Sequence, residues 1–198
     1  MNDNKMDKTR RNLLVATGAL SAAAGAAVAV PFAWSWFPSE RAKAAGAPVE
    51  ADISALAPGE LKVVEWRGKP VWILKRTKEM LDAVKQADDK VTDPKSDEPL
   101  QPAYAKNEFR SIKPDVLVLV GICSHLGCSP QSKGAEAKGE MGADWGGGFL
   151  CPCHGSKFDL AGRVYKGAPA PVNLDVPPHK FLTDGTLLIG QDDEKKGA

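Results

Sequence analysis

Two short segments contain all four cysteines of the 198-residue chain and two of its three histidines, and they constrain the fold more than any other feature. The first is residues 123–128, Cys-Ser-His-Leu-Gly-Cys, and the second is residues 151–156, Cys-Pro-Cys-His-Gly-Ser. Each offers one cysteine and one histidine as metal ligands and leaves one further cysteine. This set fits an iron–sulfur cluster with mixed ligation better than a zinc site or a disulfide framework. The many glycines and prolines around both segments favour a loop-built site on a β scaffold.

Three other classes of protein fit the sequence poorly. A structural zinc site usually uses C-x₂-C or H-x₃₋₅-H pairs, and the C-x-H spacing of Cys123 and His125 is different. A thiol–disulfide enzyme would contain C-x-x-C, whereas one residue separates Cys151 from Cys153. The net charge is only +1 and no long block of lysine or arginine occurs, so we expect no nucleic-acid partner.

The N-terminal part of the chain has the composition of a membrane anchor. Residues 12–39 contain no charged side chain, and they follow the basic residues Lys5, Lys8, Arg10 and Arg11. As a helix, the apolar residues 13–30 would span about 27 Å, close to the hydrocarbon thickness of a bilayer. Aromatic residues follow where an interfacial belt would lie, namely Phe32, Trp34, Trp36 and Phe37. We therefore predict a cytoplasmic N-terminus and one transmembrane helix within residues 1–39, with the rest of the chain across the membrane.

Two features flank this anchor. Residues 9–14, Thr-Arg-Arg-Asn-Leu-Leu, resemble a twin-arginine export signal, a pathway that moves proteins already folded around a cofactor. A cleaved secretory signal is the alternative, because residues 42–44 loosely fit a small-residue cleavage site. The length of the apolar stretch and its aromatic residues favour a retained anchor. Residues 40–47 are small and polar, which predicts a flexible linker; a helical extension is the alternative because alanine favours helix.

Residues 48–198 predict a mostly β head with one short helix. Residues 61–66 and 71–74 have the composition of a hairpin, and Thr77 can cap a helix over residues 78–87. A buried strand at residues 116–122 would deliver the first cysteine–histidine segment. We expect closing strands at 172–176, around 181 and at 187–189, and a surface or strand-edge position for His179.

The motifs C-x-H-L-G-C and C-P-C-H-G-S resemble the two boxes of the Rieske iron–sulfur proteins of quinol–cytochrome c reductases, and the resemblance extends over nearly the whole chain. It implies antiparallel sheets with a cluster-binding subdomain at about residues 118–172. It also implies one 2Fe–2S cluster in which histidines bind one of the two irons. By resemblance, the inner iron is bound by Cys123 and Cys151, and the outer iron by His125 and His154. The family's disulfide would join Cys128 and Cys153.

Four further residues match positions that adjust the cluster in this family. Ser156 matches a serine whose hydroxyl donates to a bridging sulfide. Phe158 stands where several relatives have a tyrosine that donates to a ligand sulfur, so we expect a lower reduction potential here. Pro169 lies in Gly-Ala-Pro-Ala-Pro, residues 167–171, which looks like the proline loop that covers one side of the cluster. Leu126 would shape the contact surface for cytochrome b.

The resemblance implies an electron-transfer subunit of a bacterial ubiquinol–cytochrome c reductase, catalytic as part of a complex that translocates protons in respiration. Its partners would be cytochrome b, a c-type cytochrome, ubiquinol and the lipid of the inner membrane, with the head in the periplasm. His154 would accept the hydrogen bond and proton of ubiquinol, and the head would swing on residues 40–47.

Related functions remain open from the boxes alone. The small Rieske subunit of a periplasmic oxidase such as arsenite oxidase transfers electrons without a quinol site, and the plastoquinol-oxidising relative of photosynthetic membranes has the same boxes. Rieske-type oxygenases and soluble ferredoxins generally lack the extra cysteine pair and the anchor. The proline loop, Leu126 and the long anchor favour the ubiquinol enzyme.

Overall fold

The computed structural model describes residues 8–193, and the chain divides into two compact units between Ala44 and Ala45. The main element of the first unit is α1 (Lys8–Trp34), a 27-residue helix with Pro31 near its end and no buried residue. α1 is long and apolar enough to cross a membrane, a test that a signal sequence also passes. Lys5, part of the predicted basic flank, lies outside the described residues.

A second helix, α2 (Glu40–Ala45), occupies six of the eight residues predicted to form the linker. Ser39 precedes it, and its Oγ accepts a hydrogen bond from Ala42 N at 3.2 Å, as an N-cap side chain does. The helical alternative thus holds for this segment, because alanine and a capping serine outweigh the small-residue composition. Motion about residues 40–47 stays a prediction.

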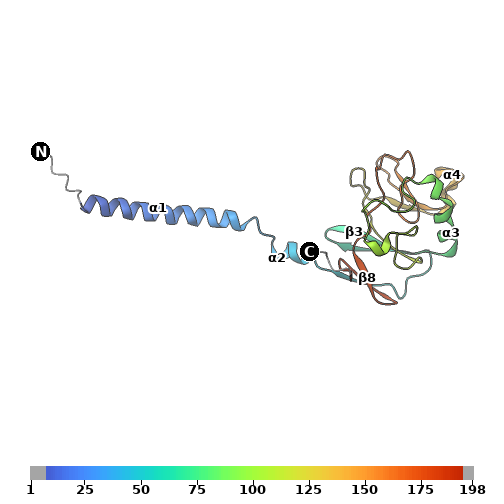
Figure 1. Cartoon of the computed structure of the whole chain (residues 1–198), viewed down its shortest axis with the longest axis horizontal. Helices are drawn as coiled ribbons and strands as arrows, with labels where there is room; N and C mark the ends of the chain where they lie inside the picture. Colours follow the sequence, from blue (N-terminus) through green and yellow to red (C-terminus); the bar gives the residue numbers. More distant parts are fainter. Residues whose placement is uncertain (1–7, 194–198) are drawn as a thin grey trace. The chain divides into compact units, whose positions relative to one another are not determined.

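In its described part, residues 45–193, the head consists of three antiparallel sheets of three strands each, with few helices, which confirms the predicted fold class (Figure 1). In their spatial order the strands are β1 (Val49–Asp52), β9 (Thr186–Ile189) and β8 (His179–Thr183); β2 (Leu61–Trp66), β3 (Lys69–Lys75) and β4 (Val116–Val120); β5 (Gln131–Lys133), β6 (Gly148–Leu150) and β7 (Lys157–Phe158). The helical elements are α3 (Lys78–Gln86), η1 (Asp88–Lys90), η2 (Ala103–Ala105), η3 (Ala135–Ala137) and α4 (Lys138–Met141).

Local sequence explains the elements that lead to the first box. β2 and β3 form the predicted hairpin, and its two-residue turn, Arg67 and Gly68, has φ values of 53° and 70°, as a type I′ turn needs. Thr77 caps α3, because its Oγ1 accepts a hydrogen bond from Met80 N at 3.3 Å. All five residues of β4 are buried, as predicted, although the strand ends at Val120.

One expectation about the C-terminal part of the head is wrong, and another holds in one of its two forms. Residues 172–176 form no strand, since their backbone bonds go to three separate segments, at Leu100, Val120 and Gly162. A strand would pair with one neighbour along its length. His179 lies in the edge strand β8, which confirms the strand-edge alternative, and it is only 1% exposed, which excludes the surface alternative. Its Nδ1 lies 2.8 Å from Pro177 O, and its ring packs edge-on against Tyr104.

Two hydrophobic cores cover opposite faces of the β2–β3–β4 sheet. The base core lies between this sheet and β1–β9–β8, and its main residues are Trp66, Val71, Ile73, Val116, Val118, Leu187 and Ile189. The site core lies on the other face, and its main residues are Trp72, Leu74, Leu117, Leu119, Cys123, Phe149, Cys151, Phe158 and Leu160. Alternate residues of β3 and β4 enter the two cores, which explains why both strands are apolar throughout.

Candidate metal centre

The two boxes fold into loops with the same backbone pattern. In the first, Cys123 N donates to Cys128 O at 2.7 Å and Gly127 N donates to Cys123 O at 3.1 Å. In the second, Cys151 N donates to Ser156 O at 2.8 Å and Gly155 N donates to Cys151 O at 2.9 Å. The fifth residue of each loop is a glycine with positive φ, 83° and 76°, which explains why glycine occupies both positions. Each loop therefore presents its first cysteine from an equivalent place, whereas the histidines differ in position, since His125 is the third residue of its loop and His154 is the fourth.

Strands and one close contact fix where the loops begin. β4 leads into the first loop, and a Cβ on Gly121 would lie 2.2 Å from the Trp72 ring, so only glycine fits there. β6 leads into the second loop and β7 leaves it. The stacked rings of Trp72 and Phe149, with centroids 4.8 Å apart, join the two approaches inside the site core.

The first cysteines of both loops are buried free thiols. Cys123 and Cys151 are each 2% exposed. Burial raises the pKa of the Cys123 thiol, and the neighbouring Cys151 thiol raises it further, whereas the backbone of His125 and the Ser156 hydroxyl lower it. Two thiols brought together in an apolar core, with a hydroxyl aimed at one of them, suit a cation that takes both as thiolates.

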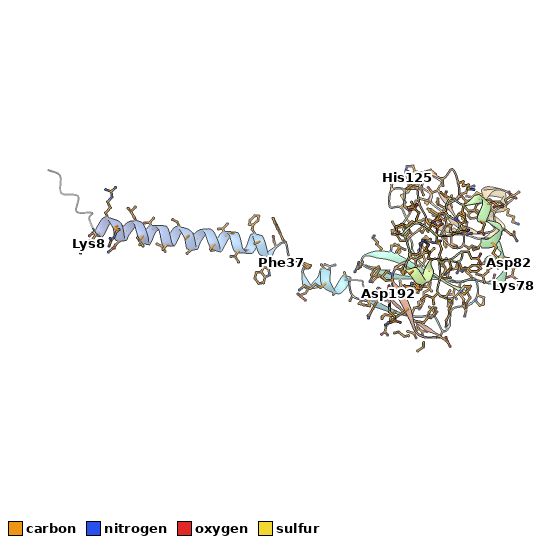
Figure 2. The ribbon with its side chains drawn as sticks, in the orientation of Figure 1. Lys8, Phe37, Lys78, Asp82, His125 and Asp192 are labelled. Atoms are coloured by element: carbon orange, nitrogen blue, oxygen red, sulfur yellow. A yellow bond between two sulfur atoms is a disulfide. The ribbon has the colours of Figure 1, made fainter. Side chains whose placement is uncertain are left out.

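The histidines form the exposed side of the centre. The rings of His125 and His154 lie with centroids 4.7 Å apart and nearly perpendicular, and His154 is exposed. His125 lies at the margin of the head (Figure 2). Its Nδ1 is buried and has no hydrogen-bond partner among residues 8–193. A buried imidazole nitrogen without a partner fits a metal ligand, because burial without a bond would otherwise cost free energy.

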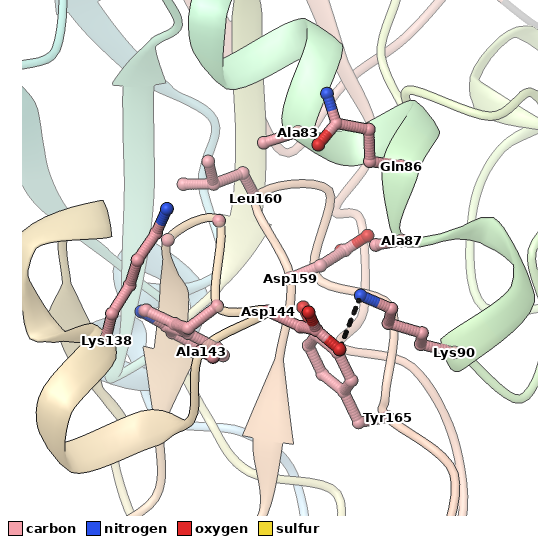
Figure 3. Close-up of a pocket in the computed structure, with 13 residues that line it drawn as sticks. Ala83, Gln86, Ala87, Lys90, Lys138, Ala143, Asp144, Asp159, Leu160 and Tyr165 are labelled. Carbon is pink, nitrogen blue, oxygen red and sulfur yellow. Dashed lines mark ion pairs between the residues drawn. The ribbon is translucent and has the colours of Figure 1, made fainter.

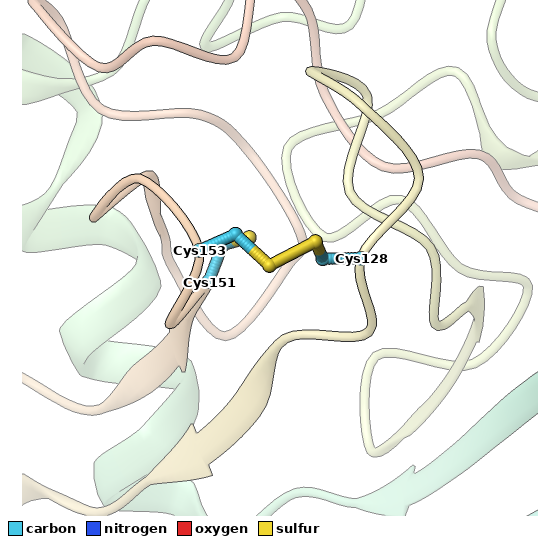
Figure 4. A group of neighbouring side chains, drawn as sticks. All are labelled: Cys128, Cys151 and Cys153. Atoms are coloured by element: carbon cyan, nitrogen blue, oxygen red, sulfur yellow. A yellow bond between two sulfur atoms is a disulfide. The ribbon is translucent and has the colours of Figure 1, made fainter.

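The remaining cysteine of each loop forms a disulfide bond, Cys128–Cys153, which ties the two boxes together (Figure 4). The sulfur atoms of this pair and that of Cys151 all lie within 4.8 Å of one another. Disulfide sulfurs carry no thiolate, so only Cys151 of these three can bind a metal.

The proline loop is hydrogen-bonded to both boxes. Ser124 Oγ donates to Val172 O at 2.6 Å, and Ala170 N donates to Ser156 Oγ at 3.0 Å. Because the Ser156 oxygen accepts from Ala170, its own proton is available to a sulfur. Pro169 is exposed, and Leu126 is 71% exposed. An apolar side chain projecting from the first loop forms part of a contact surface rather than of a core.

Residues 95–178 match the Rieske [2Fe-2S] domain family. The chain is 55% identical to the ubiquinol-cytochrome c reductase iron-sulfur subunit of Allochromatium vinosum, covering 97% of this chain and 93% of that protein. It is 42% identical to the subunit of the same name from Bradyrhizobium diazoefficiens, covering 92% and 94%. The chain belongs to the Rieske iron–sulfur subunits of ubiquinol–cytochrome c reductase. It also resembles a chain of a solved structure, "Hyperthermophilic respiratory Complex III", with 30% identity, 87% and 97% coverage and a TM-score of 0.45, which adds nothing to this assignment.

The donor set fits the Rieske cluster of the family. Two buried thiols and two neighbouring imidazoles match a centre in which cysteines bind one iron and histidines the other. A single tetrahedral zinc would bring all four ligand atoms to about 3.3–3.8 Å from one another, given its bond lengths. Among the described residues, only the three cysteines of Figure 4 gather donor atoms within 4.8 Å. The buried thiols and the more exposed imidazoles form two pairs, which suits the two irons of such a centre.

A group of buried charges behind the second box was not predicted. Asp159, Arg76, Arg110 and Arg163 are at most 3% exposed, and Asp159 directly follows β7. Their sequence signal is weak, because arginine and aspartate are usually exposed. The one hint of this group in the sequence was the four-residue spacing of Asp159 and Arg163, which allows an ion pair. In the structure Arg163 Nε lies 2.8 Å from Asp159 Oδ2.

A polar cavity of about 190 Å³ lies beside this group, and its wall includes α3, α4 and the residues after β7 (Figure 3). Its charged and polar lining residues are Gln86, Lys90, Lys138, Asp144, Asp159 and Tyr165. Burial and the nearby Asp159 carboxylate raise the pKa of Tyr165 to about 12. None of the four predicted ligands lines the cavity, so it is separate from the metal centre.

Proposed function

We propose that this chain is the electron-transfer subunit of a bacterial ubiquinol–cytochrome c reductase and works as part of that complex. When bound, the 2Fe–2S cluster supplies a one-electron carrier between ubiquinol and the c-type cytochrome. The proposal is supported most strongly by the 55% identity to a subunit of that enzyme over 97% of the chain. The partners implied by this proposal are cytochrome b, the c-type cytochrome and ubiquinol.

The membrane arrangement is part of this proposal. α1 would cross the inner membrane once, with Arg10 and Arg11 on the cytoplasmic side and the head in the periplasm. The twin-arginine signal would export the folded head, and the disulfide bond would persist because the periplasm is oxidising. Aromatic side chains that follow, among them Trp34 and Trp36, would lie at the interface with the lipid headgroups.

Unequal burial of the ligand residues supports the roles that we propose for them. Cys123 and Cys151 would bind the inner iron in the site core, whereas His125 and His154 would bind the outer iron. The exposed ring of His154 would accept a hydrogen bond from the ubiquinol hydroxyl and then its proton. Leu126 and Pro169, both exposed, would form the apolar surface around the docked quinol on cytochrome b.

The test of this function is quinol-dependent cytochrome c reduction in membranes that carry His154→Ala. We expect activity to fall at least a hundredfold, while electron paramagnetic resonance reports whether the cluster is present. His179→Asn is the matched histidine control, since His179 lies outside both boxes. Retained activity in His154→Ala would contradict the proposal, and reduction driven by arsenite would point to an oxidase subunit.

The proposed swing of the head needs its own experiment. Prolines at Gly46 and Ala47, which follow α2 and precede Pro48, would stiffen the end of the linker, because proline fixes φ. Turnover should slow severalfold while the resonance spectrum of the reduced cluster stays unchanged. Unchanged turnover with both prolines in place would contradict the swing and leave the rest of the proposal intact.

A further inference from the structure

Arg163 is a fully buried guanidinium that joins four separate parts of the head. Its Nε donates to Asp159 Oδ2 at 2.8 Å, and its Nη2 donates to Val84 O of α3 at 2.6 Å. Its Nη1 donates both to Asp88 Oδ1 at 2.7 Å and to Pro94 O at 3.0 Å. Asp159 in turn accepts from the backbone of Ala161 and Arg163, so the turn after the second box is fixed at both ends.

Two further buried arginines hold the same turn. Arg76 Nη1 donates to Leu160 O at 3.1 Å, and Arg110 Nη1 lies 3.3 Å from Ala161 O. Both also bond to residues 101–111, which places three guanidinium groups around residues 159–163. Arg110 has a φ of 50°, an uncommon conformation for a non-glycine residue, so its position is held against local backbone preference.

The group carries an excess of positive charge. Burial lowers the pKa of Arg76 and of Arg110 to about 10, so both stay protonated at neutral pH. Burial also disfavours the charge of Arg163, but the attraction and hydrogen bonds of Asp159 and Asp88 outweigh it and raise its pKa. Three buried cations face one buried carboxylate. The other carboxylates that act on them are half-buried or exposed, and solvent therefore screens them in part: Asp88, Asp93, Asp115 and Asp175. We call Arg76, Arg110, Arg163 and Asp159 the charge hub.

The charge hub adjoins the core that contains the ligand thiols. Leu160 and Ala161, whose carbonyls accept from the hub, belong to the same hydrophobic cluster as Cys123 and Cys151. Phe158, also in that cluster, directly precedes Asp159. Inside such a core a charge acts over a longer distance than in water, since neither solvent nor salt screens it fully.

We infer that the charge hub raises the reduction potential of the cluster bound by the two boxes. One-electron reduction adds a negative charge to the cluster, and a net positive hub in the same core stabilises that charge. The sign of the effect follows the sign of the residue, so Arg163 and Asp159 should act in opposite directions. The inference rests on the proposed function only in requiring a bound 2Fe–2S cluster.

The test is a redox titration of the full chain in membranes, followed by electron paramagnetic resonance of the reduced cluster. Arg163→Met should lower the ratio of reduced to oxidised cluster about tenfold at fixed ambient potential, equivalent to 59 mV for one electron. Asp159→Asn should raise the ratio, and the double variant should return near the wild-type value. Arg76→Met breaks no direct ion pair and should also lower the ratio of reduced to oxidised cluster. This variant tests the inference if Arg163→Met and Asp159→Asn fold poorly.

Arg67→Met is the matched control, because it removes the same charge from an exposed arginine and should leave the potential unchanged. Equal-signed shifts from Arg163→Met and Asp159→Asn, or none, would overturn the inference and leave the hub a structural role. If none of the hub variants binds a cluster, the inference is likewise overturned and the hub has a structural role. A wild-type chain without a reducible cluster would overturn the proposed function as well.

Discussion

The two cores of the head are built by different interactions. The base core joins two sheets through apolar side chains such as Ile73, Val118 and Leu187. The site core also contains apolar strand residues such as Trp72 and Phe149, but the loops around it are held by a disulfide, by hydrogen bonds of Ser124 and Ser156 and by the charge hub. A core of apolar side chains tolerates apolar substitutions of similar volume, whereas removal of either partner of a buried ion pair is strongly destabilising. The metal centre therefore lies in the part of the head that tolerates change least.

Removal of Asp159 should have the largest effect on stability. Asp159→Ala leaves the fully buried guanidinium of Arg163 with only its half-exposed partner Asp88. Loss of one partner of a buried ion pair typically costs about 3–5 kcal/mol in the free energy of unfolding. Thermal or denaturant unfolding of the full chain in detergent would measure it. A loss below about 1 kcal/mol would show that the site core does not depend on the hub.

Removal of the disulfide should follow closely. Cys128 and Cys153 are 25 residues apart, and a loop of that length corresponds to about 3.5 kcal/mol of chain entropy. The double variant Cys128→Ser/Cys153→Ser should unfold earlier and lose its cluster, because the boxes are no longer tied together. Retention of the resonance signal at full amplitude would contradict this dependence.

A cavity in the base core should cost stability without touching the centre. Ile73→Ala truncates a fully buried side chain, which typically costs about 3 kcal/mol. The reduced cluster should keep its resonance spectrum, since Ile73 points away from the site core. A changed spectrum would show that the two cores are coupled through β3.

Protonation of His179 should make the stability of the head sensitive to acid. Burial lowers the pKa of His179, so the unfolded chain binds more protons once the pH falls below about 6.5. Stability should then fall by up to about 1.4 kcal/mol per pH unit between that value and the lowered pKa of the folded state. His179→Asn should reduce this slope. Equal slopes for both proteins between pH 7 and pH 5 would contradict the prediction.

Phe158→Tyr should have the smallest effect, a rise in the reduction potential. Phe158 is fully buried in the site core, and the resemblance to the family implies that a hydroxyl added there would donate to a ligand sulfur. A redox titration measures the shift, and an unfolding curve checks that the extra oxygen fits. A potential that stays the same or falls would contradict the role of this position.

The sequence predicted the central strands of the head better than the segments around the metal centre. Strands β2 and β4 and the Thr77 cap follow from composition and local rules, whereas the short strands β5 to β7 contain too few residues for a periodic pattern. Residues 172–176 were wrongly predicted as a strand, because an apolar run does not reveal that its backbone bonds to three different segments. The ligand residues were found through their spacing, but no pattern marks an arginine that is buried by partners 69–79 residues away.

The hydrogen-bonded ladder between β5 and β6 indicates where a probe of head motion can be attached. It closes the chain between the boxes at Lys133 and Gly148, and the enclosed lobe is exposed at residues 138–140 while Met141 and Trp145 are buried. A Cβ on Gly139, within that lobe, would meet nothing within 4 Å. A spin label or fluorophore attached there would report the position of the head during turnover without entering either core.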